Sequence, residues 1–176
     1  MNFKSKIALA TLFLIVTSGL SCKTNQYFVF TCNGEKVLIP KHPDKYYKDE
    51  LSSWEISLKG SVEELKTVEK IELTPSIRKT VVSKREKLDQ LSGRLRDIIY
   101  ASSRSVERHP CDKAAAIRHQ DLLTSIAKEV TTAEALKTSV HEARTASNFQ
   151  GMNESKLRQA INEYETNSEM LNIPGI

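Results

Sequence analysis

The stretch of residues 74–112, TPSIRKTVVSKREKLDQLSGRLRDIIYASSRSVERHPCD, decides the fold of this chain. Threonine is favoured just before a helix, and the proline that follows it is preferred at the first helical position. Apolar residues then recur at helical spacing and predict a helix from residue 75 to about Ser105. These residues are Ile77, Val81, Leu88, Leu91, Leu95 and Ile98. Pro110 interrupts the pattern, so this first helix must end before it.

A second long helix follows the break, with Asp112 as its N-terminal cap and an end near Ser147. Its apolar stripe consists of Ala116, Leu123, Ile126, Val130, Ala133, Val140 and Ala143. Each helix has roughly 30 residues and is about 45 Å long. Because only a short break separates the two stripes, the sequence predicts an antiparallel helical hairpin. A weaker stripe predicts a third, C-terminal helix, and its residues are Leu157, Ile161, Tyr164 and Leu171.

The segment before these helices begins with a strong β-hairpin pattern, YFVFTCNGEKVLIP, at residues 27–40. β-Branched and aromatic residues flank Asn33-Gly34, a pair that suits a two-residue type I′ turn. That turn predicts three pairs of opposed residues: Cys32 with Glu35, Phe30 with Val37, and Phe28 with Ile39. The apolar members of these pairs, Phe28, Phe30, Val37 and Ile39, are expected to pack inward.

Two further strands are expected before the long helices. The prolines at the start of residues 40–53 indicate a loop there. Residues 54–58, WEISL, alternate apolar and polar side chains, and we interpret residues 68–73, VEKIEL, in the same way. Gly60-Ser61 would separate the two strands, with a short helical turn at residues 61–64.

Together these patterns predict an α+β fold. A small antiparallel β-sheet region occupies residues 22–74, and a helical region occupies residues 75–176 with the helical hairpin and the third helix. The two regions are expected to form a single domain over residues 22–176, which is a typical domain length.

The first residues predict export. Two lysines precede an uncharged apolar run at residues 7–16, and small polar residues follow it. The run is only about half the length of a membrane-spanning helix, so residues 1–21 are interpreted as a bacterial signal peptide.

The sequence GLSC at residues 19–22 resembles the lipobox of bacterial lipoproteins. Ser21 and Cys22 match that pattern, whereas Gly19 and Leu20 depart from it. The resemblance implies cleavage before Cys22 and acyl chains such as palmitate on this cysteine. The alternative is ordinary signal-peptidase cleavage near Ser21, which would leave Cys22 as a plain thiol.

The cysteine count fits the lipoprotein interpretation. The chain has three cysteines, and an odd number in an exported protein leaves one thiol unpaired. If Cys22 is acylated, Cys32 and Cys111 remain as a pair in an oxidising compartment. Because Cys32 adjoins the predicted turn and Cys111 adjoins the break between the helices, we expect a disulfide that ties the sheet to the helical hairpin. Two separate thiols are the alternative.

Charge and motifs argue against several functional classes. The whole chain has 26 basic and 22 acidic side chains, and loss of the two lysines in residues 1–21 leaves a charge of +2. No basic stripe with interleaved aromatics occurs, so nucleic-acid binding is not indicated. His42, His109, His119 and His141 do not have the spacing of metal ligands, and no cofactor or metal is expected. No hydrolase, zinc-protease or phosphate-binding motif occurs, so the sequence predicts no enzyme.

Residues 27–39, YFVFTCNGEKVLI, resemble the opening hairpin of membrane-bound lysozyme-inhibitor lipoproteins, in which a cysteine precedes a turn and a glycine. Those proteins are small β-barrels and use a Ser-Gly-x-x-Tyr motif, which this chain lacks. We therefore interpret the resemblance as shared hairpin chemistry.

The expected function is that of a membrane-anchored bacterial envelope lipoprotein with a non-catalytic binding or accessory role. Its partners would be the membrane, through the lipid anchor, and a protein in an envelope assembly, with no small-molecule substrate. Lys23 differs from the aspartate that retains lipoproteins in the inner membrane of enteric bacteria, so the outer membrane, facing the periplasm, is expected where the host has one. The alternative is an inhibitor or immunity-type protein that blocks an envelope enzyme. An envelope hydrolase has the least support.

Overall fold

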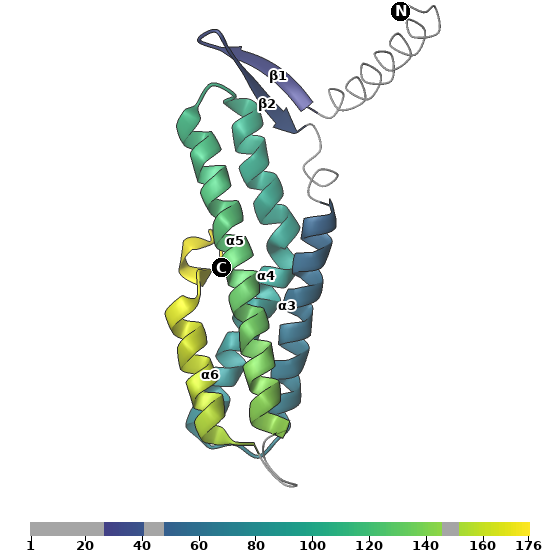
Figure 1. Cartoon of the computed structure of the whole chain (residues 1–176), viewed down its shortest axis with the longest axis vertical. Helices are drawn as coiled ribbons and strands as arrows, with labels where there is room; N and C mark the ends of the chain where they lie inside the picture. The colour runs from purple at the N-terminus through teal and green to yellow at the C-terminus, as the bar shows by residue number, and fades with distance from the viewer. Residues whose placement is uncertain (1–26, 41–47, 146–151) are drawn as a thin grey trace, which may run out of the picture.

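The part of the chain that the structure describes is mostly helical, with four α-helices and one two-stranded sheet (Figure 1). The computed structural model describes residues 27–40, 48–145 and 152–176. Its elements in chain order are β1 (Tyr27–Cys32), β2 (Glu35–Pro40), α3 (Lys48–Glu69), α4 (Pro75–Arg108), α5 (Lys113–Thr145), α6 (Glu154–Asn167) and the short 3₁₀ helix η2 (Met170–Asn172). The α+β expectation is right in this coarse form.

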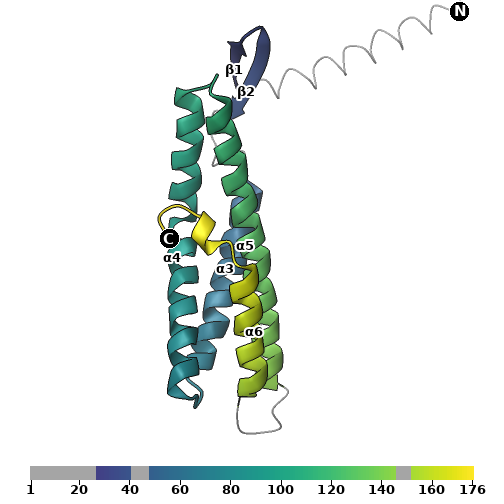
Figure 2. The same ribbon diagram turned by 90° about the vertical axis from the view of Figure 1, so that its left-hand side faces the viewer.

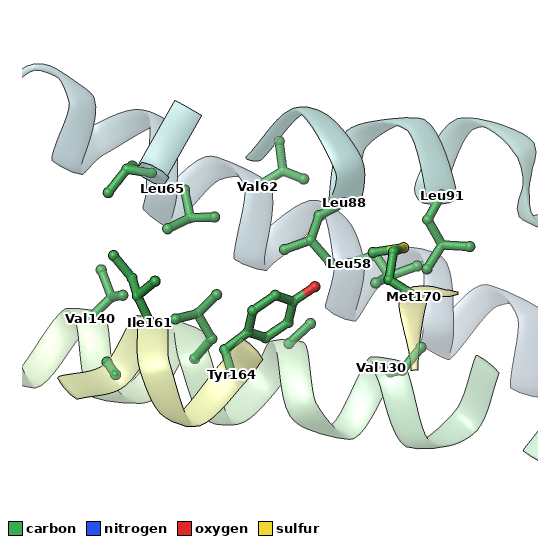
Figure 3. Packing of buried hydrophobic residues seen from close by; sticks show 14 of the residues in the cluster. Leu58, Val62, Leu65, Leu88, Leu91, Val130, Val140, Ile161, Tyr164 and Met170 are labelled. Carbon is green, nitrogen blue, oxygen red and sulfur yellow. The ribbon is translucent and has the colours of Figure 1, made fainter. Parts of the chain in front are cut away.

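The helices run alternately up and down along one long axis (Figures 1 and 2). α3 packs against both α4 and α5, and α6 packs mainly against α5. Their apolar stripes meet in one core, in which Leu58 and Leu65 of α3 and Leu88 of α4 are fully buried (Figure 3). Ile161 and Tyr164 of α6 close this core from the opposite side.

α4 follows the predicted pattern closely. It begins at Pro75, as predicted, and ends at Arg108, three residues beyond the expected end. The predicted apolar residues from Ile77 to Ile98 are all buried. Thr74 occupies the position before the helix, but its side chain does not cap the helix. Instead, the Thr74 backbone N–H donates to Glu154 Oε1 at 2.8 Å, which joins the starts of α4 and α6.

α5 also agrees with its predicted position. Asp112 caps it, because Asp112 Oδ1 accepts a hydrogen bond from the backbone N–H of Ala114 at 2.9 Å. The predicted stripe is buried except for Ala116, which is exposed while its neighbour Ala115 is buried. The buried face also includes Glu129, which lies within the predicted apolar stripe.

The third helix is shorter than its predicted apolar stripe. α6 ends at Asn167, and the chain then turns into η2. Leu157, Ile161 and Tyr164 are buried, but Leu171 is 95% exposed, so its inclusion in the stripe is wrong. The helix has ended before Leu171, and helical spacing no longer relates this residue to the core.

The predicted strands at residues 54–58 and 68–73 are wrong, because residues 48–69 form α3 and residues 70–73 form a turn without strand pairing. The expected loop also ends earlier than predicted, since residues 48–53 are helical. The sheet region is therefore confined to residues 27–40 among the described residues. Gly60 and Ser61 lie inside α3 and do not interrupt it.

The β-hairpin has the predicted register. Cys32 pairs with Glu35, Phe30 with Val37, and Phe28 with Ile39. Asn33 has φ 54° and Gly34 has φ 84°, as a type I′ turn requires. The hairpin lies across the end of the bundle where α4 joins α5 (Figure 1). The predicted signal peptide and Cys22 lie outside the described residues.

Candidate functional site

The most distinctive surface lies on a two-helix projection, which we call the arm. The arm consists of residues 98–108 of α4 and residues 113–123 of α5. In both views these segments extend beyond the start of α3 and beyond the C-terminal residues that follow α6 (Figures 1 and 2). The rest of the bundle has three or four helices around its core, whereas the arm has two. One of its faces therefore lacks the helix that covers the corresponding surface lower in the bundle.

A groove of about 540 Å³ runs along this face of the arm, and we call it the arm groove. Its apolar wall includes Ile98 and Ala101 of α4 together with Ala115 and Leu122 of α5. Hydroxyl groups and charges lie among these residues, and Pro174 and Gly175 close its lower end. The volume lies in the range of sites that hold a small molecule or a few side chains of a partner. The polar and charged lining residues are Arg94, Asp97, Ser102, Ser105 and Arg118.

The charged residues of the arm groove are partly held by neighbours. Arg94 Nη1 donates a hydrogen bond to the carbonyl oxygen of Gly175, which fastens the C-terminal residues to α4. Arg118 Nη2 lies 3.5 Å from Asp112 Oδ2, next to the start of α5. Between these two charged ends, Ile98, Ala115 and Leu122 are mostly buried at the base of the groove, and Ala101 is the exposed apolar residue of its wall. Such a surface suits a ligand with an apolar stripe and polar flanks.

The arm is closed at its tip by the hairpin. Cys32 and Cys111 form a disulfide there, with Cα atoms 5.3 Å apart and a sequence separation of 79. Phe30 of β1 packs against Val106 of α4 and Ala115 of α5, which form a small apolar cluster apart from the main core. Among the side chains that the structure describes, the disulfide and Phe30 link the hairpin to the tip of the arm. The sequence predicted this pairing, because Cys32 adjoins the hairpin turn and Cys111 adjoins the break between the two long helices.

Glu129 has a buried carboxylate that the sequence patterns do not predict. It is fully buried on α5 and accepts hydrogen bonds from Tyr164 Oη, from Ser168 Oγ at 2.8 Å and from the backbone N–H of Glu169 at 2.7 Å. Burial and the adjacent Glu129 carboxylate raise the pKa of Tyr164. All the donors come from the end of α6 and the residues just after it. Glu129 therefore ties the C-terminal segment to α5.

The sequence signal for Glu129 was present but ambiguous. Glu129 falls between Ile126 and Val130 within the apolar stripe, where a charged residue is unusual. The donors that satisfy it lie about 35 to 40 residues further along the chain. A sequence pattern does not reveal contacts over that separation. Its role in this structure is to hold the fold, because it opens into no groove described above.

The histidines do not converge on one site. His119 Nδ1 lies 3.0 Å from Ser102 Oγ on the arm, and burial lowers the pKa of His119. His141 is near Glu64 at the other end of α5, and His109 lies in the turn between α4 and α5. His42 lies outside the described residues. Within residues 27–40, 48–145 and 152–176, no group of three or more His, Cys, Asp or Glu side chains is placed to hold a metal ion.

Two further observations concern the class of protein. Among the helices that the structure describes, none has the length and apolar character needed to cross a membrane. Comparisons of the chain with protein-family models, with curated proteins and with solved structures find no match.

Proposed function

We propose that this chain is a membrane-anchored bacterial envelope lipoprotein that binds a protein partner through the arm groove and catalyses no reaction. The observation that carries the proposal is the apolar face of the arm, where no third helix of the described chain lies on α4 and α5. Lower in the bundle, α3 and α6 cover these two helices. The lipobox-like sequence ending at Cys22 supports the anchor. The apolar wall of the arm groove supports the partner site.

An amphipathic helix of the partner is the occupant that fits this face best. Ile98 and Leu122 belong to the apolar stripes of α4 and α5, and further down the bundle α3 and α6 cover those stripes. A third helix laid along the arm would bury the same kind of surface in the same way. Arg94 and Asp97 at one end and Arg118 at the other would then set the direction of that helix through charge.

Two arginine substitutions on the arm test the site. Ala101 is exposed and lines the arm groove, so Ala101→Arg places a long charged side chain in the groove without disturbing a buried residue. Ala116 is exposed on α5 outside the groove, so Ala116→Arg is the matched control. Both changes retain good helix formers.

The measurement is cross-linking in intact cells, followed by binding of the purified partner. We expect one envelope protein to cross-link to the wild type and to Ala116→Arg, and at least tenfold weaker binding of that purified protein to Ala101→Arg. Equal binding to both variants would remove the groove from the proposal. If the captured protein is a soluble enzyme that the lipoprotein inhibits at a one-to-one ratio, the protein is an inhibitor rather than an accessory factor.

A further inference from the structure

We propose that the hairpin end of the molecule is a membrane-apposed face that binds the anionic surface of the bilayer holding the anchor. The inference rests on the proposed acylation of Cys22. It adds an orientation, with the β-hairpin and the tip of the arm against the lipid headgroups and the α3–α4 turn pointing away. The face consists of Val29, Lys36, Leu38, Arg108 and Lys113.

The length of chain between the anchor and the fold sets this orientation. Tyr27, the first residue of β1, is five residues after Cys22. Five residues span at most about 18 Å even when fully extended. α4 alone has 34 residues, a length of about 51 Å. The start of β1 must therefore stay close to the headgroups, while the far end of the bundle has no such restraint.

The surface of the hairpin matches that position. Val29 and Leu38 are directly opposed across the two strands and are 53% and 59% exposed. Phe30, the next residue along β1, turns to the other face of the sheet and packs on the arm. The exposed pair therefore points away from the bundle. Aliphatic side chains in this position can enter the headgroup region of a bilayer.

The charges around the hairpin are complementary to anionic lipid. Lys36 on β2, Arg108 at the end of α4 and Lys113 at the start of α5 are all exposed. Arg104 and Arg118 at the same end are paired with Glu107 and Asp112. Within residues 27–40 and 104–118, Glu35 is the remaining acidic residue, beside the three exposed basic residues Lys36, Arg108 and Lys113, while Asp121 lies further down the arm. Basic residues held near a bilayer by a tether bind its anionic headgroups.

This orientation also restricts the partner. Arg94, at the lower end of the arm groove, is 14 residues before Arg108, or about 21 Å along the helix. With the hairpin on the lipid surface, the whole groove lies near the headgroups. A partner bound in the groove must therefore fit beside the lipid surface.

The test uses the full lipoprotein purified from membranes and reconstituted through its own anchor. Hydroxyl-radical oxidation is measured in vesicles of phosphatidylcholine with about one-third phosphatidylglycerol, in vesicles of phosphatidylcholine alone, and in detergent. We expect oxidation of Val29 and Leu38 to fall at least threefold in the anionic vesicles relative to detergent. Ile56 and Leu171, which are 72% and 95% exposed on the bundle, should be oxidised equally in all samples.

A charge reversal is the second part of the test. Lys36→Glu combined with Lys113→Glu should abolish the protection in anionic vesicles. Lys79→Glu combined with Lys87→Glu is the matched control, because it makes the same change in net charge at exposed positions lower on α4. This control should leave the protection of Val29 and Leu38 intact. Unprotected Val29 and Leu38, or protection confined to Ile56 and Leu171, would overturn the orientation. Protection in native envelopes but not in lipid vesicles would also overturn it, because a protein would then cover the face.

Intact mass of the same sample separates the two proposals. A diacylglyceryl adduct on Cys22 together with an unprotected hairpin refutes only the membrane-apposed face. A mature chain without the adduct refutes both the anchor and the orientation that depends on it.

Discussion

At the residue scale, Glu129 is the most consequential side chain in the described part of the chain. A buried carboxylate is costly unless its oxygens accept hydrogen bonds, and here three donors satisfy it. Hydrogen bonds to a charged acceptor are stronger than those between neutral groups. The network joins the middle of α5 to the end of α6 and the start of η2. Glu129 thus helps to hold the C-terminal segment, together with the buried Met170 and Ile173 and the hydrogen bond from Arg94 to Gly175.

Glu129→Gln should therefore destabilise the protein. An amide retains one acceptor oxygen but places an NH₂ group where the carboxylate accepted hydrogen bonds, and the backbone N–H of Glu169 is itself only a donor. We expect a loss of about 1–3 kcal/mol in the free energy of unfolding, measured by urea denaturation. Glu142→Gln, at an exposed position on the same helix, should change it by less than about 0.5 kcal/mol. Equal effects of the two substitutions would contradict the role given to Glu129.

Tyr164 predicts a specific loss of stability in alkali. Its pKa in the folded protein is raised, so the folded state keeps this proton at a pH where the unfolded chain has lost it. The unfolded state then binds fewer protons, and stability falls as pH rises above the ordinary tyrosine pKa of about 10. Tyr164→Phe should cost about 1 kcal/mol at neutral pH, because Glu129 loses one donor.

The pH dependence distinguishes this mechanism from a simple packing defect. The stability difference between wild type and Tyr164→Phe should shrink between about pH 9 and pH 11, because only the wild type has this proton to lose on unfolding. Urea denaturation at several pH values measures it. A difference that stays constant over this interval would show that Tyr164 does not contribute through its proton.

At the element scale, α3 shows how a short pattern can mislead. Trp54, Ile56 and Leu58 alternate like a strand, but in the helix Leu58 is buried and Ile56 is 72% exposed. The longer spacing of Leu51, Leu58, Val62 and Leu65 is helical, and these residues form the buried face. Asp49 and Glu50 in the first turn also favour a helix through its dipole.

Ser61 has a packing role in α3. Ser61 is fully buried, and its Oγ donates a hydrogen bond to the carbonyl oxygen of Ala133 on α5 at 2.9 Å. A Cβ atom at Gly60 would meet only the flexible end of the exposed Lys137 side chain on α5. In the sequence, Gly60 and Ser61 suggested a break.

The hairpin depends on its link to the arm. A two-stranded hairpin is marginal in isolation, and Phe30 is its contact with the apolar cluster of Val106 and Ala115. The disulfide closes a loop with a sequence separation of 79, for which chain-entropy estimates give about 4 kcal/mol. No hairpin side chain that the structure describes belongs to the main core of the helices.

Cys111→Ser should consequently lower the melting temperature by on the order of 10 °C while leaving the helical circular dichroism at room temperature nearly unchanged. Amide hydrogen exchange should increase first in β1 and β2. The double substitution Cys32→Ser with Cys111→Ser should lower the melting temperature by the same amount as Cys111→Ser, because either change removes the disulfide. A melting temperature that does not respond to reduction of the wild type would contradict a stabilising disulfide.

At the scale of the whole molecule, a well-covered lower bundle supports a sparsely covered arm. α3 and α6 both pack on α5 in the lower part, whereas the arm relies on the contact between α4 and α5 and on the hairpin. In the proposed orientation, the lower bundle with its core lies away from the membrane surface, and the arm groove lies beside that surface. This arrangement suits a protein that presents a site close to the lipid surface.

The anchor itself is tested by Cys22→Ala. If Cys22 is the acylated N-terminus, the wild type should sediment with membranes and carry a diacylglyceryl adduct in its intact mass. The variant should move to the soluble fraction or remain uncleaved, since stable anchoring needs two acyl chains or their equivalent. Cys111→Ser should stay with the membrane, because it removes a cysteine without removing the anchor. A wild-type mature chain that begins at another residue would refute this prediction.

The sequence alone determined the elements whose signals are local and long. The stripes from Ile77 to Ile98 and from Leu123 to Ala143 persist over many turns, and capping residues such as Asp112 mark a boundary. The hairpin register follows from Asn33-Gly34, because a two-residue turn leaves one way to pair the strands. Cys32 and Cys111 adjoin such boundaries, so their proximity could be anticipated.

Only the tertiary structure decided the rest. Whether Trp54 to Leu58 becomes strand or helix depends on α4 and α5, which offer a surface that a helix covers through Leu58, Val62 and Leu65. Glu129 is acceptable inside because donors near Ser168 reach it from another helix. The arm groove exists because α3 and α6 end short of it. Each outcome arises from contacts between segments far apart in the chain, and their free energies outweigh the weak preferences of a five-residue pattern.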